Sequence, residues 1–221
     1  MTERNGLASP PAGVGLDGLR AAAAGCRACE LGEPATQTVF GEGPESARIV
    51  FVGEQPGDQE DRKGEPFVGP AGRLLDRALG DAGIDRRDAY VTNAVKHFRF
   101  TPTPKRRIHQ TPGPEHVRAC RPWLEAEFAV LKPEVVVCLG ATAAKALISP
   151  SFRITKERGK LLPWTPPGVS DDGDEDEDAP SQTWMLATMH PSAILRTPDE
   201  SRAAAYDALV ADLEVVAQAL A

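Results

Sequence analysis

The sequence predicts an α/β fold, a three-layer α/β/α sandwich with a central four-stranded parallel sheet. Two observations carry this prediction. Four short runs rich in β-branched residues are apolar on both faces, as parallel strands covered by helices must be. Segments with helical periodicity alternate with these runs, which is the arrangement of a sheet covered on both sides. The length of 221 residues suits a single domain, which we predict over residues 14–221.

The elements follow one another at regular intervals. The predicted strands are Arg48–Gly53, Ala89–Val95, Glu134–Leu139 and Trp184–Thr188. The predicted helices are Leu16–Ala24, Gly72–Ala82, Pro114–Leu131, Thr142–Ile148 and Ser201–Leu220. A proline in the first turn, as at Pro114, is typical of a helix start. Residues 1–13 are expected to be disordered and 165–181 to form an acidic flexible insertion, because both are too polar to build a core.

The composition is that of an intracellular globular protein. Hydrophobic residues make up 41% of the chain and charged residues 26%, and no apolar run approaches the roughly 20 residues that cross a bilayer. The amino terminus lacks the basic start and apolar stretch of a signal peptide, so we expect a cytoplasmic protein. In that compartment four cysteines are better candidates for metal ligands or buried apolar residues than for disulfides.

The net charge of −7 is distributed unevenly. Seven acidic side chains lie within residues 171–178, and without them the net charge is zero. Between Lys96 and Arg121 there are seven basic residues and a single acidic one, Glu115. A phosphate backbone responds to a local patch within a Debye length of roughly 8–10 Å. The basic stretch therefore indicates a nucleic-acid partner, although a solvated basic loop would have the same composition.

The cysteines form one close pair and two isolated positions. Cys26 and Cys29 make a C-x-x-C pair after the first predicted helix, whereas Cys120 lies in a helix and Cys138 in a strand. Thiolates select zinc or iron–sulfur clusters, and this spacing is not that of a zinc ribbon, whose second pair is also C-x-x-C. The alternative for Cys120 and Cys138 is that they are small buried apolar residues.

Polar and aromatic residues follow the carboxyl ends of the predicted strands, where α/β folds bind their ligands. Glu54 and Asp58 follow the first strand in GEQPGDQED, and Phe67 comes next in the glycine-rich GEPFVGPAG. Asn93 ends the second strand, and its carboxamide can both donate to and accept from a pyrimidine edge. His190, in HPSA, follows the last strand. Each of these residues, taken alone, is equally consistent with a turn or a cap.

In their order and spacing these motifs resemble the iron–sulfur uracil-DNA glycosylases of family 4, from about Leu16 to the end of the chain with only the acidic insertion left out. The resemblance implies that Phe67 stacks on uracil, Asn93 reads the base edge and His190 stabilises the departing base. The implied cofactor is a [4Fe–4S] cluster with the ligands Cys26, Cys29, Cys120 and Cys138.

Two departures from family 4 resemble its UdgX branch. GEQPG replaces the usual GEAPG, with Gln55 in place of alanine, and a basic segment, KRRIHQTP, is inserted at Lys105–Pro112. In that branch the histidine of this segment becomes covalently attached to the abasic deoxyribose. The resemblance therefore implies cleavage of the N-glycosidic bond followed by attack of His109 on the anomeric carbon. Glu54 is the expected group to orient His109 or to accept its proton.

The remaining expectations concern DNA and assembly. The phosphate contacts are expected from Lys105, Arg106 and Arg107. The substrate pocket is expected to contain Gln55, Asp58, Phe67 and Asn93. Uracil must be flipped out or already unpaired, so we expect a preference for single-stranded DNA, and we expect a monomer without membrane association. Two alternatives stay open: a turnover glycosylase in which water replaces His109, and a catalytically silent iron–sulfur DNA-binding module.

Overall fold

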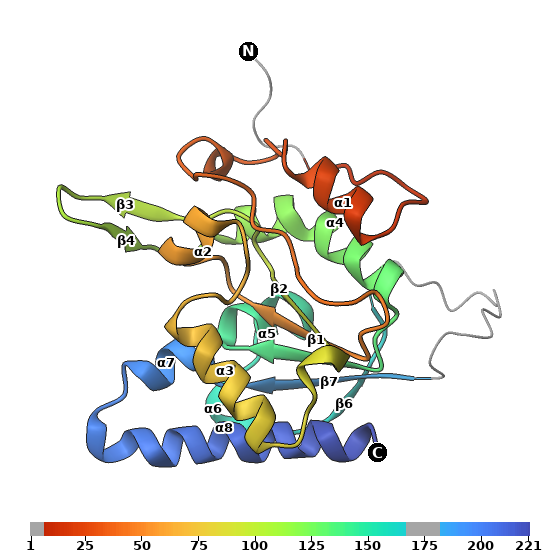
Figure 1. The fold of residues 1–221 in the computed structure, drawn as a ribbon, viewed down its shortest axis with the longest axis vertical. Helices are drawn as coiled ribbons and strands as arrows, with labels where there is room; N and C mark the ends of the chain where they lie inside the picture. Colours follow the sequence, from red (N-terminus) through yellow and green to blue (C-terminus); the bar gives the residue numbers. More distant parts are fainter. Residues whose placement is uncertain (1–6, 167–181) are drawn as a thin grey trace.

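The computed structural model describes residues 7–166 and 182–221, which are built around one five-stranded sheet. Its strands are β1 (Ile49–Gly53), β2 (Ala89–Asn93), β5 (Val135–Leu139), β6 (Leu162–Trp164) and β7 (Thr183–Thr188). They run in the order β2-β1-β5-β7-β6 (Figure 1). β2, β1, β5 and β7 are parallel, which confirms the predicted sheet, and β6 adds an antiparallel edge strand that the sequence analysis did not predict.

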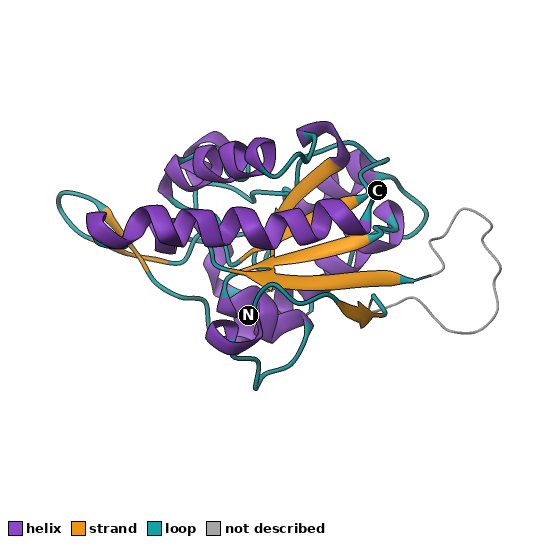
Figure 2. Ribbon diagram, turned by 90° about the horizontal axis from the view of Figure 1, so that it is seen from below, coloured by secondary structure: helices purple, strands orange, loops and turns teal. Residues whose placement is uncertain are grey.

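Helices cover both faces of the sheet, which confirms the predicted sandwich. One face carries α3 (Pro70–Asp81), α7 (Pro191–Leu195) and α8 (Asp199–Ala219). The other carries α1 (Leu16–Ala23), α4 (Pro114–Leu131) and α5 (Ala141–Leu147). Figure 2 shows α8 lying across the strands. Because alternate residues of a strand point to opposite faces, Phe51 packs with Leu75 and Leu213 on the first face, whereas Val50 packs with Leu124 on the second.

Short elements lie between the main ones. They are η1 (Glu30–Gly32), α2 (Asp58–Lys63), η2 (Arg86–Asp88), β3 (Phe100–Pro102), β4 (Arg107–His109) and α6 (Ile154–Glu157). β3 and β4 pair as an antiparallel hairpin, and its second strand lies in the basic inserted segment. In Figure 1 this hairpin projects from the body of the protein, with α2 beside its base.

The two segments predicted to lack order fall largely outside the described residues, since these begin at residue 7 and omit 167–181. The described part of the first segment is packed. Ala8 is buried, and its backbone N–H donates to the carbonyl oxygen of Ala119 at 3.0 Å. At least one position before residue 14 is therefore packed against α4. Among the helices that the structure describes, none combines the length and the apolar character needed to cross a membrane.

Candidate active site

Residues from separate segments of the chain meet at one edge of the sheet. The carboxyl ends of β1, β2, β5 and β7 share this edge because the four strands are parallel. Glu54 follows β1 and Asn93 ends β2. Thr142 lies in the first turn of α5, after β5, and His190 is the N-cap of α7, after β7. The edge therefore combines a carboxylate, a carboxamide, a hydroxyl and an imidazole.

Phe67 is held near this edge by an uncommon backbone conformation. Its φ of 57° lies in the left-handed region, which residues with a Cβ seldom adopt outside functional sites. The Phe67 ring stacks with the ring of His190 at a centroid distance of 6.1 Å and an interplanar angle of 24°. A Cβ at position 72 would lie 1.5 Å from the carbonyl oxygen of Phe67, so the turn requires Gly72.

Asn93 offers an unused carboxamide beside Phe67. A Cβ on Gly53 would lie 2.3 Å from Oδ1 of Asn93 and 2.8 Å from Cζ of Phe67, so both side chains lie against this glycine. Asn93 is 3% exposed, and its carboxamide makes no hydrogen bond within the part of the chain that the structure describes. Neither polar atom of the carboxamide is among the fully buried, unpaired atoms of the described residues, so the group still faces solvent at the site. It is therefore free to pair with a planar ligand that both accepts and donates hydrogen bonds.

Ser192 determines which nitrogen of His190 carries the proton. Nδ1 of His190 accepts a hydrogen bond from the backbone N–H of Ser192 at 3.1 Å and lies 2.8 Å from the Ser192 hydroxyl oxygen. The proton of the neutral ring is therefore on Nε2. Burial lowers the pKa of His190 to about 4, with the charge of Arg196 as a smaller cause. At pH 7 His190 is a neutral donor through Nε2–H.

The side-chain amide of Gln55 lies against the Nε2 nitrogen of His109. Oε1 of Gln55 accepts a hydrogen bond from the backbone N–H of Arg99 at 3.0 Å. This contact identifies the other terminal atom of the amide as the nitrogen, Nε2. This donor nitrogen lies 2.9 Å from Nε2 of His109 and 3.0 Å from the carbonyl oxygen of Gln110. The carbonyl oxygen of Arg99, at 3.2 Å, is a third neighbour of this nitrogen. An amide nitrogen can only donate, so a hydrogen bond from Gln55 to His109 requires Nε2 of His109 to be unprotonated. The predicted substrate-binding residue Gln55 thus contacts His109 and the backbone around it.

Glu54 lies on the other side of this imidazole. Its Oε1 is 3.6 Å from Nε2 of His109, and its Oε2 accepts a hydrogen bond from the hydroxyl of Thr142. Burial lowers the pKa of His109, although Glu54 acts in the opposite direction. The His109 side chain is 49% exposed, so an incoming substrate can reach it. The sequence analysis missed Thr142, because a threonine in the first turn of a helix carries no signal of its own.

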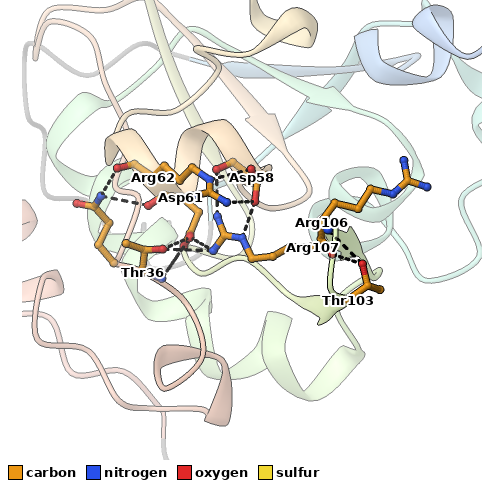
Figure 3. Close-up of polar contacts among 8 residues, drawn as sticks. Thr36, Asp58, Asp61, Arg62, Thr103, Arg106 and Arg107 are labelled. Carbon is orange, nitrogen blue, oxygen red and sulfur yellow. Dashed lines mark hydrogen bonds and ion pairs between the residues drawn. The ribbon is translucent and has the colours of Figure 1, made fainter.

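Arg107 is bound within the protein, as Figure 3 shows. Its Nε donates to Oδ1 of Asp58 at 2.5 Å and its Nη1 to Oδ2 of Asp61 at 2.6 Å. The guanidinium carbon also lies 5.3 Å from the ring centroid of Phe98 and 4.9 Å from that of Phe100. The side chain is only 16% exposed. Arg107 therefore fastens the hairpin to α2, which leaves its donors little access to a DNA phosphate.

Asp58 is occupied by ion pairs next to Arg107, whereas Lys105 and Arg106 are exposed. Asp58, predicted to contact the substrate, is paired with Arg62 at 2.9 Å as well as with Arg107, and these two arginines hold its pKa below the usual value. Lys105 and Arg106 lie exposed between the two strands of the hairpin. In Figure 3 the Arg106 side chain points away from Arg107. Two of the three predicted phosphate contacts are thus available to a ligand.

Three of the four cysteines lie in one region, at the packed ends of α1, η1 and α4. The indole N–H of Trp123, on the same helix as Cys120, lies 3.4 Å from Sγ of Cys26. Burial raises the pKa of the Cys120 thiol to about 12, with Cys26 and Cys29 among the smaller causes. No group of three or more histidine, cysteine or acidic side chains in the described residues is already arranged to hold a metal ion.

Cys138 lies in different surroundings. It is fully buried in β5 within the core cluster that contains Leu124 of α4, and its Sγ is 3.8 Å from Sδ of Met185. Burial raises the pKa of the Cys138 thiol. These are the surroundings of a buried apolar residue, the alternative that its sequence context left open. Cys26, Cys29 and Cys120 therefore lie in one region of the described structure, and Cys138 lies apart from them in the core.

His97 lies next to the three grouped cysteines. A Cβ on Gly32 would be 3.5 Å from Cε1 of the buried His97 and 2.9 Å from the carbonyl oxygen of Cys26. The residue before it, Lys96, donates its backbone N–H to Sγ of Cys120 at 3.2 Å. Burial lowers the pKa of His97 to about 4, so the ring is neutral and able to bind a metal. His97 was not among the expected ligands, because only the cysteines carry a ligand signal in the sequence.

Comparison with known proteins agrees with this arrangement. The family model of the uracil DNA glycosylase superfamily matches residues 40–214. A type-4 uracil-DNA glycosylase of Thermotoga maritima is 40% identical over 172 residues, which are 77% of this chain and 78% of that protein. The type-4 enzyme of Archaeoglobus fulgidus is 37% identical over 177 residues, covering 78% of this chain and 79% of the relative. This chain belongs to the uracil DNA glycosylase superfamily.

Proposed function

We propose that the protein excises uracil from DNA and becomes covalently linked to the resulting abasic deoxyribose through His109. The excision step is supported by membership of the superfamily and by relatives that are type-4 uracil-DNA glycosylases. The covalent step is supported by one observation above all. His109 lies next to Glu54, and its Nε2 contacts the amide nitrogen of Gln55, a group that donates only to an unprotonated nitrogen such as a nucleophile must present.

Uracil recognition would use the side-chain carboxamide of Asn93, which has no hydrogen-bond partner among the described residues. Uracil displays a carbonyl oxygen and an N–H side by side, and the Asn93 carboxamide can pair with both. Phe67 supplies an aromatic face for stacking, in a position fixed by Gly72. A base in this slot has left the DNA stack, so the enzyme must flip it out or act on single strands, which we propose it prefers.

His190 would assist the departure of the base. As the N-glycosidic bond breaks, its electron pair leaves with uracil and negative charge develops on the uracil oxygens. The Nε2–H of the neutral His190 ring is positioned by Ser192 to donate to such an oxygen. A single preorganised donor of this kind typically lowers the barrier by roughly 3–4 kcal/mol. The sugar left behind carries the compensating positive charge.

His109 would then capture the sugar. The lone pair on Nε2 forms a bond to the anomeric carbon once the substrate displaces the Gln55 N–H from that nitrogen. The ring becomes an imidazolium that still carries its Nδ1 proton, and this proton passes to solvent or to the released uracil anion. Glu54 offsets the positive charge while it lasts. Because no water is consumed at the sugar, the product is a protein–DNA adduct and the enzyme turns over once.

DNA binding would involve the exposed part of the hairpin. Lys105 and Arg106 extend from the segment that also carries His109, so phosphate contacts there would bring the deoxyribose to the nucleophile. Such contacts release counterions and add no sequence preference. We do not assign this role to Arg107, because its donors are occupied by Asp58 and Asp61.

For the cofactor we propose a [4Fe–4S] cluster that Cys26, Cys29 and Cys120 hold through three thiolates. A bound cluster would cross-link the segment after α1 to α4. As the fourth ligand we propose His97 in place of Cys138. A neutral imidazole replaces thiolate on iron in other iron–sulfur proteins, and His97 adjoins the cysteine group while Cys138 contacts Met185.

The decisive experiment mixes the protein with an end-labelled oligonucleotide that contains one uracil and resolves the products on a denaturing gel. Our proposal predicts a band shifted by the mass of the protein, in an amount that cannot exceed the protein added. Free abasic DNA over several turnovers would instead indicate a hydrolytic glycosylase, the alternative that the names of the type-4 relatives favour. Unchanged DNA would indicate a silent binding module. A thymine-containing oligonucleotide of the same sequence is the control.

A further inference from the structure

We infer that Lys96 is a positioning residue for Asn93, acting through the backbone at the end of β2. The inference rests on the proposed function, in which Asn93 reads the base. Lys96 is a fully buried cation that the chemistry proposed above does not use. Its ammonium group donates to the carbonyl oxygen of Asn93 at 3.0 Å. The side chain therefore folds back by three residues and holds the very residue whose carboxamide faces the ligand.

The other partners of Lys96 fix it in place. Its Nζ is 2.5 Å from Oε2 of Glu127 and 2.5 Å from the hydroxyl oxygen of Thr92. Glu127, on α4, is also fully buried and accepts hydrogen bonds from the hydroxyls of Tyr90 and Thr92, both at 2.9 Å. All three donor positions of the ammonium group are occupied. The network thus holds the carboxyl end of β2 against α4.

Stability alone does not account for this ion pair. Replacing a buried pair by apolar residues of similar volume is often neutral or stabilising, because desolvation cancels much of the attraction. An apolar pair would, however, leave the buried carbonyl oxygen of Asn93 without the donor it has here. Lys96 also donates its backbone N–H to Sγ of Cys120. One residue therefore anchors the base-reading strand end to α4 and to the cysteine group.

A pair of variants separates positioning from stability. Glu127→Gln keeps the shape of the network and the Lys96 donor but leaves the buried ammonium group without its counter-charge, so it serves as the control for loss of the ion pair. Lys96→Met/Glu127→Gln also removes the donor to Asn93, in a neutral core that avoids an unpaired buried charge. Uracil excision is measured in a single turnover at saturating DNA, and thermal unfolding is measured in parallel. Leu213→Ala, in the core cluster on the opposite face, controls for loss of stability without contact with the network.

Positioning predicts that Lys96→Met/Glu127→Gln excises uracil at least about tenfold more slowly than Glu127→Gln, the size expected for a lost hydrogen bond to a charged donor. Leu213→Ala should lose stability and keep its rate. Adding Asn93→Ala to both backgrounds closes a double-mutant cycle. If Lys96 acts through Asn93, the tenfold difference should disappear once Asn93 is absent.

Two results would overturn the inference. Equal excision rates for Glu127→Gln and Lys96→Met/Glu127→Gln would show that the donor is not needed. A tenfold difference that persists in the Asn93→Ala background would show that Lys96 acts by another route. Failure of the wild-type protein to release uracil is a separate outcome, which would refute the proposed function and with it this inference.

Discussion

Replacing Arg107 by methionine should both destabilise the protein and detach the nucleophile from its site. Methionine keeps the unbranched stem that packs near Phe98 and Phe100 but removes the guanidinium group. Arg107 lies in β4, two residues before His109, and it joins this strand to α2 through Asp58 and Asp61. The substitution therefore removes the polar attachment of the hairpin while leaving its apolar contacts.

The cost can be estimated from the two carboxylates. Asp58 is partly exposed and keeps Arg62 as a partner, so its loss is that of a surface pair, roughly 0–1 kcal/mol. Asp61 is fully buried and keeps only the hydrogen bonds from Thr36. Leaving one partner of a buried pair uncompensated costs about 3–5 kcal/mol. We expect a loss near that range, reduced to the extent that the hairpin moves away and lets water reach Asp61.

Function should be lost selectively. In the proposed mechanism, uracil release uses Phe67, Asn93 and His190, whereas adduct formation needs His109 in place; the contacts of Arg107 are with Asp58, Asp61, Thr36, Phe98 and Phe100. Single-turnover gels of Arg107→Met should show abasic DNA appearing at a rate close to that of the wild type and the shifted band at least about tenfold more slowly, since a small misplacement of a nucleophile is costly. Asp61→Asn added to Arg107→Met should recover much of the stability.

The neighbouring Arg106→Met is the matched control. Arg106 is exposed, so stability should change by less than about 0.5 kcal/mol. DNA binding should weaken for every flanking sequence, and the slope of log affinity against log salt should fall by roughly 0.7–0.9. The assignment of the two arginines is refuted if Arg107→Met is as stable as the wild type and shows the weakened, salt-dependent binding predicted for Arg106→Met.

Three further predictions test the site. His109→Ser should abolish the shifted band and release abasic DNA over several turnovers, because water can reach the same carbon; a persistent adduct would identify another nucleophile. His97→Ser should bleach the brown colour expected of the purified protein, whereas Cys138→Ser should keep it; the opposite pattern would restore the four-cysteine set. His190 has a folded-state pKa of about 4, below the unfolded value of about 6.5, so the unfolded chain alone takes up its proton within that window. The free energy of unfolding should therefore have its full value above pH 6.5 and fall as the pH drops towards 4, by up to about 1.4 kcal/mol per unit for one proton. His190→Gln should reduce that slope in acid titrations followed by thermal unfolding.

The fold was predictable from local patterns. The strands at Val135–Leu139 and Ile49–Gly53 are continuous apolar runs, and a run buried on both faces marks a covered parallel sheet. The helix from Pro114 to Leu131 has the predicted bounds because a proline and a charged turn delimit it. β6 was missed because its three residues include a proline and no apolar alternation, and its place is set by pairing with β7.

The site was predictable only in part. The sequence indicates which side chains lie at strand ends, but it does not indicate which residues they contact. Parallel strands bring Asn93 and His190 to one edge whatever the details of packing, so topology alone indicates that they lie together. The partner of Glu54 lies 88 residues away, at Thr142, and that of Asp61 lies 46 residues away, at Arg107. No periodicity connects such positions, and only the folded chain reveals them.

Gln55 illustrates what the structure adds to a motif. In the sequence it is a departure from GEAPG, next to a glutamate in a loop predicted to bind substrate. In the structure its amide spans 54 residues to reach His109 and also binds the backbone of Arg99 and Gln110. An alanine at this position has no polar atoms with which to make these contacts. Gln55 and the hairpin therefore act together: the hairpin carries the imidazole of His109, and the Gln55 amide contacts the nitrogen that we propose to be the nucleophile.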